Sequence, residues 1–182
     1  MDERELRGRR LVEIARAAIL ADPAHRPSPR PWPEEWLRAT AATFVTLRDR
    51  GDLRGCIGTV DAHRALGDDV TANAHAAAYR DPRFPPVALH ERERLEVEVS
   101  LLSARAPIAA ASEAALAGEL RPGVDGIVLE YEGSRATFLP QVWESLPDPI
   151  DFLAELRRKA GLPARFWRPE LKVSRYTVEK YR

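Results

Sequence analysis

Two residues of one predicted β-strand, Arg54 and Cys56, have side chains suited to thiol chemistry. They are two positions apart, so on an extended strand they project from the same face with their backbones about 7 Å apart. A thiol reacts as its thiolate, and a neighbouring guanidinium favours that charged form. Gly55 and Gly58 leave space beside the strand for a substrate or a second backbone. The segment 53–58, Leu-Arg-Gly-Cys-Ile-Gly, therefore contains the parts of an activated cysteine.

A structural interpretation of the same strand stays open. The single cysteine of an intracellular domain is commonly a small buried hydrophobic residue. Glycines inside a strand commonly mark a bulge or the close approach of another element. Under this interpretation Arg54 satisfies carbonyl groups inside the fold, and its replacement lowers stability before it lowers activity.

A second candidate pair, Asp81 and Arg83, follows a predicted helix in the segment Asp-Pro-Arg-Phe. Asp-Pro is a strong turn signal, and the local sequence alone favours a turn over a binding site. His75, inside the helix, is expected to be a core or boundary residue rather than a catalyst. The four histidines are far apart in the sequence, and there is one cysteine. With no phosphate-binding glycine loop either, no metal or cofactor site is predicted.

The strand that carries Arg54 and Cys56 is expected to form half of a β-hairpin over residues 43–59. A three-residue loop, 49–51, places its glycine at the position that needs a positive φ. Leu47 then pairs with Leu53. This register separates an apolar core face from a polar face that carries both chemistry-bearing side chains.

Hydrophobic periodicity predicts the remaining elements. Residues 1–40 are expected to form an N-terminal helix and a proline-rich strap. The other predicted elements are helices at 65–80, 112–120 and 149–160, a strand at 95–103, a hairpin at 127–139 and a strand at 171–181. A hairpin followed by a helix thus occurs twice. This pattern indicates an α+β fold with two lobes, built from a duplicated β-hairpin-plus-helix unit with mostly antiparallel or mixed sheets.

Composition limits the classes of function. The chain has 182 residues, with 28 basic and 28 acidic side chains. The balanced charge gives no global field that would draw the protein to nucleic acid or to anionic lipid. No apolar run resembles a signal peptide or a membrane span, so a cytoplasmic location without membrane association is expected. The sequence carries no signal for an oligomeric state.

Short motifs follow one another in a recognisable order from about residue 44 to residue 162. They are Phe44–Leu47, Gly51, Leu53–Gly58, Asn73–Ala74, Ala76–Ala77, Asp81–Phe84, Glu98–Leu102, Gly123–Ile127, Phe138–Trp143 and Lys159–Leu162. Together they resemble the AMMECR-type domain family, whose prokaryotic members are called AmmeMemoRadiSam system protein A. The resemblance implies one two-lobed AMMECR-type domain over residues 1–182.

The resemblance also implies an intracellular protein that acts with Memo-type and radical SAM proteins. RNA modification is among the activities suggested for the family, and no reaction is assigned. The motif residues are candidates for a cleft. The catalytic candidates are Arg54 and Cys56, and the substrate-binding candidates are Asp81, Arg83, Asp125, Gln141 and Lys159.

Two functional hypotheses are open beside the structural one. In the first, the chain is an enzyme or an enzyme component: Arg54, Arg83 and Lys159 hold an anionic substrate, and the thiol of Cys56 is a nucleophile or a redox group. In the second, a non-catalytic module presents a surface to a Memo-type or radical SAM partner, or to RNA. The polar face of the first hairpin favours the enzyme hypothesis slightly.

Overall fold

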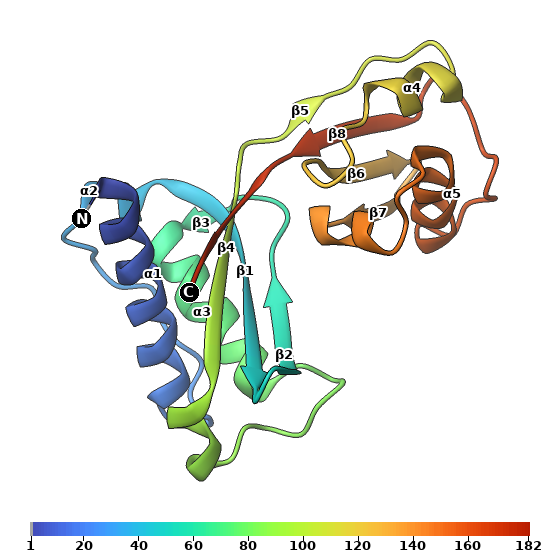
Figure 1. Ribbon diagram of the computed structural model, residues 1–182. Helices are drawn as coiled ribbons and strands as arrows, with labels where there is room; N and C mark the ends of the chain where they lie inside the picture. Colours follow the sequence, from blue (N-terminus) through green and yellow to red (C-terminus); the bar gives the residue numbers. More distant parts are fainter. Residues whose placement is uncertain (1) are drawn as a thin grey trace. The chain divides into compact units, whose positions relative to one another are not determined.

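The computed structural model describes residues 2–182, so residue 1 of the predicted domain lies outside the described residues. The chain divides into two compact units (Figure 1). The first comprises the chain up to Leu102 together with Glu179–Arg182, and the second comprises Ser103–Val178. Both units contain helices and antiparallel strand pairs, which confirms the predicted α+β class. Among residues 2–182 no helix is long and apolar enough to cross a membrane.

The first unit is built on a five-stranded sheet. Its elements are α1 (Glu3–Leu20), α2 (Glu35–Arg38), β1 (Thr40–Asp49), β2 (Asp52–Gly58), β3 (Arg64–Ala65), α3 (Leu66–Tyr79), the 3₁₀ helix η1 (Leu89–Arg94), β4 (Glu96–Leu102) and β9 (Val178–Tyr181). The strand order is β2-β1-β4-β9, and β3 pairs with the start of β1. Figure 1 shows α1 and α3 beside the sheet. Apolar side chains of these helices form one core with those of β1 and β4.

Alternation along the strands explains this core. In the middle of β1 and β4 alternate residues are apolar and buried: Val45 and Leu47 on β1, and Val97 and Val99 on β4. The core face of the sheet therefore meets the apolar stripes of two helices. The strap between α1 and β1 is anchored by Trp32, which is buried and whose indole N–H donates to an Asp68 carboxylate oxygen at 2.9 Å.

Helix α1 ends without a glycine, and side chains from elsewhere in the first unit bind its last carbonyls. The hydroxyl of Tyr79 donates to the carbonyl of Ile19, and Arg92 Nη1 donates to the carbonyl of Leu20 at 3.3 Å. These bonds replace the backbone cap that a C-terminal glycine normally supplies. They also join α1 to α3 and η1.

The turn of the first hairpin differs from the prediction. It contains two residues, Arg50 and Gly51, with φ angles of 53° and 88°. Positive φ at both central residues is the mark of a type I′ turn, whose twist matches that of the flanking strands. The predicted three-residue loop is wrong because Arg50 adopts a conformation that non-glycine residues rarely take, and its side chain gives no signal of this.

The register of the hairpin changes with the turn. Leu47 pairs with Gly55 instead of Leu53, and Arg48 pairs with Leu53. A β-bulge lies between these two pairs and leaves Arg54 without a partner residue on β1. Leu53, predicted to lie on the core face, is 38% exposed. The bulge therefore removes Arg54 from the regular alternation that was expected to align it with the cysteine.

The second unit is built on a four-stranded sheet in the order β5-β8-β6-β7. Its elements are β5 (Ala106–Pro107), α4 (Glu113–Glu119), β6 (Gly126–Tyr131), β7 (Ser134–Phe138), the 3₁₀ helix η2 (Pro140–Glu144), α5 (Pro149–Lys159) and β8 (Lys172–Tyr176). Helix α5 begins at Pro149, with the Asp148 carboxylate accepting from the backbone N–H groups of residues 150 and 151. Apolar residues of α4, α5 and η2 form one core with the sheet.

The last predicted strand, 171–181, is two strands. β8 pairs with β5 and β6, whereas β9 belongs to the other sheet. Between them, the N–H of Thr177 donates to the hydroxyl of Ser103 at 2.9 Å, and the N–H of Ser103 donates to the carbonyl of Thr177 at 3.0 Å. The prediction was wrong because alternation indicates an extended backbone without indicating which sheet it joins.

Helix α3 and strand β2 approach each other closely at Gly55, and this contact can be tested. A Cβ at Gly55 would lie 2.1 Å from the carbonyl oxygen of Ala77. Gly55→Ala must displace one backbone from the other, so we expect it to lower the free energy of unfolding by about 2 kcal/mol or more in urea denaturation.

The matched control is Gly118→Ala, in helix α4. Nothing lies within 4 Å of the added Cβ there. Alanine is a better helix former than glycine, so this variant is expected to be neutral or more stable by up to about 1 kcal/mol. Equal losses in the two variants would contradict the close-contact explanation.

Candidate functional site

Strand β2 lies at the edge of the first sheet, so one side of its backbone has no neighbouring strand. At Cys56 two charged side chains bind this free side. The Asp81 carboxylate accepts a hydrogen bond from the N–H of Cys56 at 2.9 Å. Arg83 Nη2 donates to the carbonyl oxygen of Cys56 at 3.1 Å. The two side chains together take the place of a neighbouring strand at this one residue.

Asp81 and Arg83 are also bound to each other. Arg83 Nε and Nη2 donate to the two carboxylate oxygens at 2.9 and 2.7 Å, and the Arg83 backbone N–H donates at 3.1 Å. The Asp81 side chain is 1% exposed. Hydrogen bonds from Arg83, helped by the N–H of Cys56, hold the pKa of Asp81 well below its usual range, although burial acts in the opposite direction. The carboxylate is therefore ionised at neutral pH.

Arg54 is bound to the segment that follows helix α3. Its Nε and Nη2 each donate to one Glu91 carboxylate oxygen at 3.0 Å. Its Nη1 donates to the carbonyl of Pro85 at 2.9 Å. The Arg54 and Glu91 side chains are 13% and 14% exposed, and the guanidinium lowers the pKa of the Glu91 carboxyl. Arg54 therefore holds the loop against β2 and satisfies a carbonyl, as the structural interpretation describes.

The Cys56 thiol is partly accessible and has a simple environment. Its sulfur lies 3.4 Å from the hydroxyl of Thr46, which faces it from β1. The Arg83 guanidinium also interacts with this side chain: the pKa of Arg83 is raised, chiefly by Asp81 and to a smaller extent by Cys56. His75 is buried, and its ring nitrogen lies 3.3 Å from the carbonyl oxygen of Asp22. The site therefore contains a thiol without the neighbouring base of a nucleophile–base pair.

A buried polar network beside this hairpin was not predicted. The Asp69 carboxylate accepts from the N–H and hydroxyl of Thr43 at 2.8 and 2.7 Å, from the hydroxyl of Thr59 at 2.9 Å, and from Arg64 Nε at 2.7 Å. Asn73 donates to the same carboxylate at 3.0 Å. Asp69 and Asn73 are four residues apart on α3, which places them on one helix face. Polar residues at this spacing within an apolar stripe are the signal that the sequence offered.

Asp125, in the second unit, is fully buried. Its carboxylate accepts from Arg121 through the backbone N–H at 3.0 Å, Nε at 3.0 Å and Nη2 at 2.6 Å. Its backbone carbonyl accepts from the indole N–H of Trp143 at 2.7 Å. Asp125 thus closes the turn before β6 and joins it to η2.

The last two candidates lie elsewhere in the second unit. Lys159, at the end of α5, donates from Nζ to the carbonyl of Thr137 at 2.9 Å, and its ammonium lies 5.0 Å from the ring centroid of Phe138. Gln141 is exposed on η2. Within the described part of the chain, no hydrogen bond joins Asp125, Gln141 and Lys159 to one another.

The seven candidates therefore fall into two groups. Cys56, Asp81 and Arg83 form one hydrogen-bonded cluster in the first unit, and Arg54 binds the adjoining loop. In the second unit Asp125 and Lys159 have separate partners, and Gln141 is exposed on η2. The prediction that all seven line one cleft stays a prediction.

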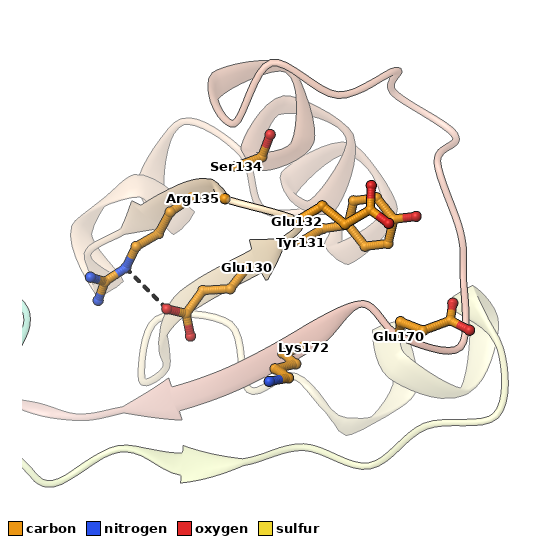
Figure 2. Close-up of a pocket in the computed structure, with 8 residues that line it drawn as sticks. Glu130, Tyr131, Glu132, Ser134, Arg135, Glu170 and Lys172 are labelled. Carbon is orange, nitrogen blue, oxygen red and sulfur yellow. Dashed lines mark ion pairs between the residues drawn. The ribbon is translucent and has the colours of Figure 1, made fainter.

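Three pockets of the described residues are lined by other residues. In the first unit a pocket of about 270 Å³ includes Thr46, Arg48 and Glu98 but not Cys56. In the second unit a pocket of about 300 Å³ lies at the tip of the β6–β7 hairpin. Figure 2 shows Glu130 and Arg135, joined by an ion pair, on one side of this pocket. A neighbouring pocket of about 540 Å³ runs beside β5 and β8. Sequence reasoning missed all three.

The two units and the order of the motifs define an AMMECR-type domain, and comparison with known proteins agrees. The AMMECR1 family model matches residues 12–181, so the chain belongs to this family. A Methanothermobacter thermautotrophicus protein is 39% identical over 181 residues, 94% of this chain and 92% of the relative. A Thermotoga maritima protein is 36% identical and covers 82% of each chain. The crystal structure of uncharacterized protein PH0010 from Pyrococcus horikoshii matches with a TM-score of 0.83 and 34% identity, over 95% of this chain and 89% of that one.

The Asp81–Arg83 pair predicts a specific acid sensitivity. The folded-state pKa of Asp81 is depressed, so the carboxylate contributes stability that is complete above its unfolded pKa of about 4 and is lost as the pH falls below that value. Asp81→Asn keeps an oxygen that can accept from Cys56 but loses the charge. We expect the free energy of unfolding at pH 7 to fall by about 2 kcal/mol, and its dependence on pH below about 4 to become weaker.

Urea denaturation between pH 3 and pH 7 measures both quantities. Asp52→Asn is the control, because Asp52 is an exposed carboxylate at the start of the same strand. This control is expected to change stability by less than about 0.5 kcal/mol. An Asp81→Asn profile that ran parallel to the wild-type profile would exclude the proposed linkage.

Proposed function

We propose that this chain is a partner-binding component of a protein assembly rather than a catalyst that works alone. The observation with most weight is that the two motif arginines, Arg54 and Arg83, are each already bound to a carboxylate of the same chain. The Nε and Nη2 groups of Arg54 bind Glu91, and those of Arg83 bind Asp81. An arginine recognises a carboxylate or phosphate through this same pair of N–H groups. Because both pairs are occupied, the motif charges are better suited to holding the hairpin than to holding an anionic substrate.

The proposed partners are a Memo-type protein and a radical SAM protein, which is the class that the family resemblance suggests. In this role the motifs fix the shape of a surface. The contacts on Cys56 also close part of the edge of β2, which prevents unselective strand addition there. An RNA-binding role has less support, because charge is balanced at 28 basic and 28 acidic residues and RNA binding draws on free cations.

Co-expression with one Memo-type and one radical SAM protein from the same genome tests the proposal. We expect a complex that survives gel filtration at about 0.15 M salt, where weak surface attraction is screened. Cys56→Ser removes the thiol and keeps the backbone that Asp81 and Arg83 bind, so this variant is expected to retain the complex. Absence of a complex with either protein would overturn the proposal.

A second candidate function, thiol chemistry at Cys56, is favoured by one observation. The thiol is partly accessible, and the guanidinium of Arg83 donates to the carbonyl of the same residue. An adjacent cation lowers a thiol pKa and speeds alkylation. Thr46 and Arg83 both interact with the Cys56 side chain, but neither is a base that could take the thiol proton. Thiol catalysis and partner binding therefore predict different reactivity of the thiol.

Iodoacetamide alkylation at pH 7 distinguishes thiol chemistry at Cys56 from partner binding alone. With no base beside the sulfur, we expect the folded chain to react no faster than the same chain unfolded in urea. Cys56 is the one cysteine of the sequence, so the unfolded chain is a matched reference thiol. A folded-state rate about tenfold or more above that reference would favour the catalytic function over partner binding alone.

A further inference from the structure

The second sheet carries a row of charges on the face opposite its core. Glu130 on β6 pairs across the sheet with Arg135 on β7 and with Lys172 on β8. Leu129, Ala136 and Val173, each next to one of these residues along its strand, belong to the core, so the charged side chains point away from it. One carboxylate therefore lies between two cations in register.

The negative charge of Glu130 is already balanced by two arginines. Its two carboxylate oxygens lie 3.4 Å from Arg135 Nε and 3.3 Å from Arg105 Nη1. The exposed Lys172 side chain has no hydrogen-bond or ion-pair partner among residues 2–182. Lys172 and Glu130 line both the smaller and the larger of the pockets described above for this unit, so the Lys172 side chain lies where these two pockets meet. Figure 2 shows both residues in the smaller pocket.

The larger pocket has the form of a groove, hereafter the β5–β8 groove. Its lining comes from two antiparallel segments, 105–110 and 169–174, which are joined by the β5–β8 pairing and by the hydrogen bond from the N–H of Ile108 to the carbonyl of Val173 at 2.8 Å. The paired part therefore forms the floor of the groove, and the lining continues along both segments beyond it. Residues 172–174 of β8 are extended and span about 10 Å, and the lining continues past them to the turn at 169–170 and along 108–110, so the groove is elongated. The walls are mostly apolar, and among their residues are Pro107, Ile108, Ala109, Pro169 and Leu171. A volume of about 540 Å³ is enough to hold several side chains.

The charges of the lining residues limit which ligands can bind in the β5–β8 groove. The β5–β8 groove has two cations, Arg105 and Lys172, and one carboxylate, Glu130. Beyond Lys172, the smaller pocket adds the carboxylates of Glu132 and Glu170 on the side away from Arg135 (Figure 2). A complementary ligand therefore has an apolar body for the walls and a single carboxylate at Lys172, because a further acid toward the hairpin tip would meet those two glutamates.

The edge of the sheet limits how such a ligand lies. Strand β5 forms the edge, and its residue Pro107 has no N–H to offer an added strand. Recognition by strand addition is therefore interrupted at this position. An extended chain that lies along the groove with alternate side chains pointing inward does not need that N–H.

We propose that the β5–β8 groove docks an extended segment of a partner protein, in which two apolar side chains flank one Glu or Asp that binds Lys172. The proposal rests on the proposed function in one respect, that the ligand is a protein. It names a site and a recognition chemistry that do not involve the motif residues of the first unit.

The probe is the acetylated and amidated peptide Leu-Ser-Glu-Ser-Leu, whose first, third and fifth side chains point to one side when extended. It is titrated into the ¹⁵N-labelled full chain and followed by NMR. We expect saturable shifts at residues 105–110 and 169–174 with a Kd below about 1 mM. Lys172→Glu is expected to weaken binding by about tenfold, because repulsion replaces attraction.

Two controls make the result specific. Arg165→Glu changes the charge equally at an exposed position of the same unit that lines neither the β5–β8 groove nor the smaller pocket, and it should leave binding within about twofold. A peptide with Lys in place of Glu should bind the wild type more weakly.

The proposal is overturned if the acidic peptide causes no shift in the groove at millimolar concentration, if both peptides bind equally, or if both variants lose binding alike. None of these results depends on a Memo-type or radical SAM protein, so they are distinct from failure of the co-expression experiment.

Discussion

The hydrogen bond from the N–H of Cys56 to the buried carboxylate of Asp81 is the contact on which the first unit depends most. An edge strand leaves backbone groups unpaired, and a buried N–H without a partner is costly. Here a charged acceptor meets the N–H, and Arg83 both balances that acceptor and binds the Cys56 carbonyl. The strand, the loop after α3 and the charge pair therefore form one cooperative arrangement.

The neighbouring motif residues extend this arrangement. Gly55 lets the backbone of α3 reach β2, and Arg54 holds the loop through Glu91 and the carbonyl of Pro85. The Asp69 carboxylate accepts hydrogen bonds from Thr43 and Arg64 at the other end of the β1–β2 pair. Side chains that look reactive in the sequence are thus engaged with one another, which is why the structure supports a surface-forming role better than a substrate-binding one.

The second unit provides a contrast. Its motif residues Asp125 and Lys159 are bound to their own unit, as in the first. The two pockets described above for this unit are lined instead by residues outside the motifs, and Lys172, which has no ion-pair partner among residues 2–182, lies beside the apolar lining of the larger one. A charge that the fold leaves unsatisfied is available to a ligand, whereas a paired charge must first be released. This difference directs attention to the β5–β8 groove as a recognition site.

The sequence by itself determined the α+β class, the positions of most helices and strands, and membership of the AMMECR1 family, because periodicity and short motifs are local properties. Only the tertiary structure decided what the charged residues do. Arg54 meets Glu91 across 37 residues, and Cys56 meets Asp81 across 25. The positive φ of Arg50, the bulge at Arg54 and the division of the last strand between two sheets were equally invisible. Each depends on which distant segment packs alongside, and a local pattern of residue types does not specify that partner.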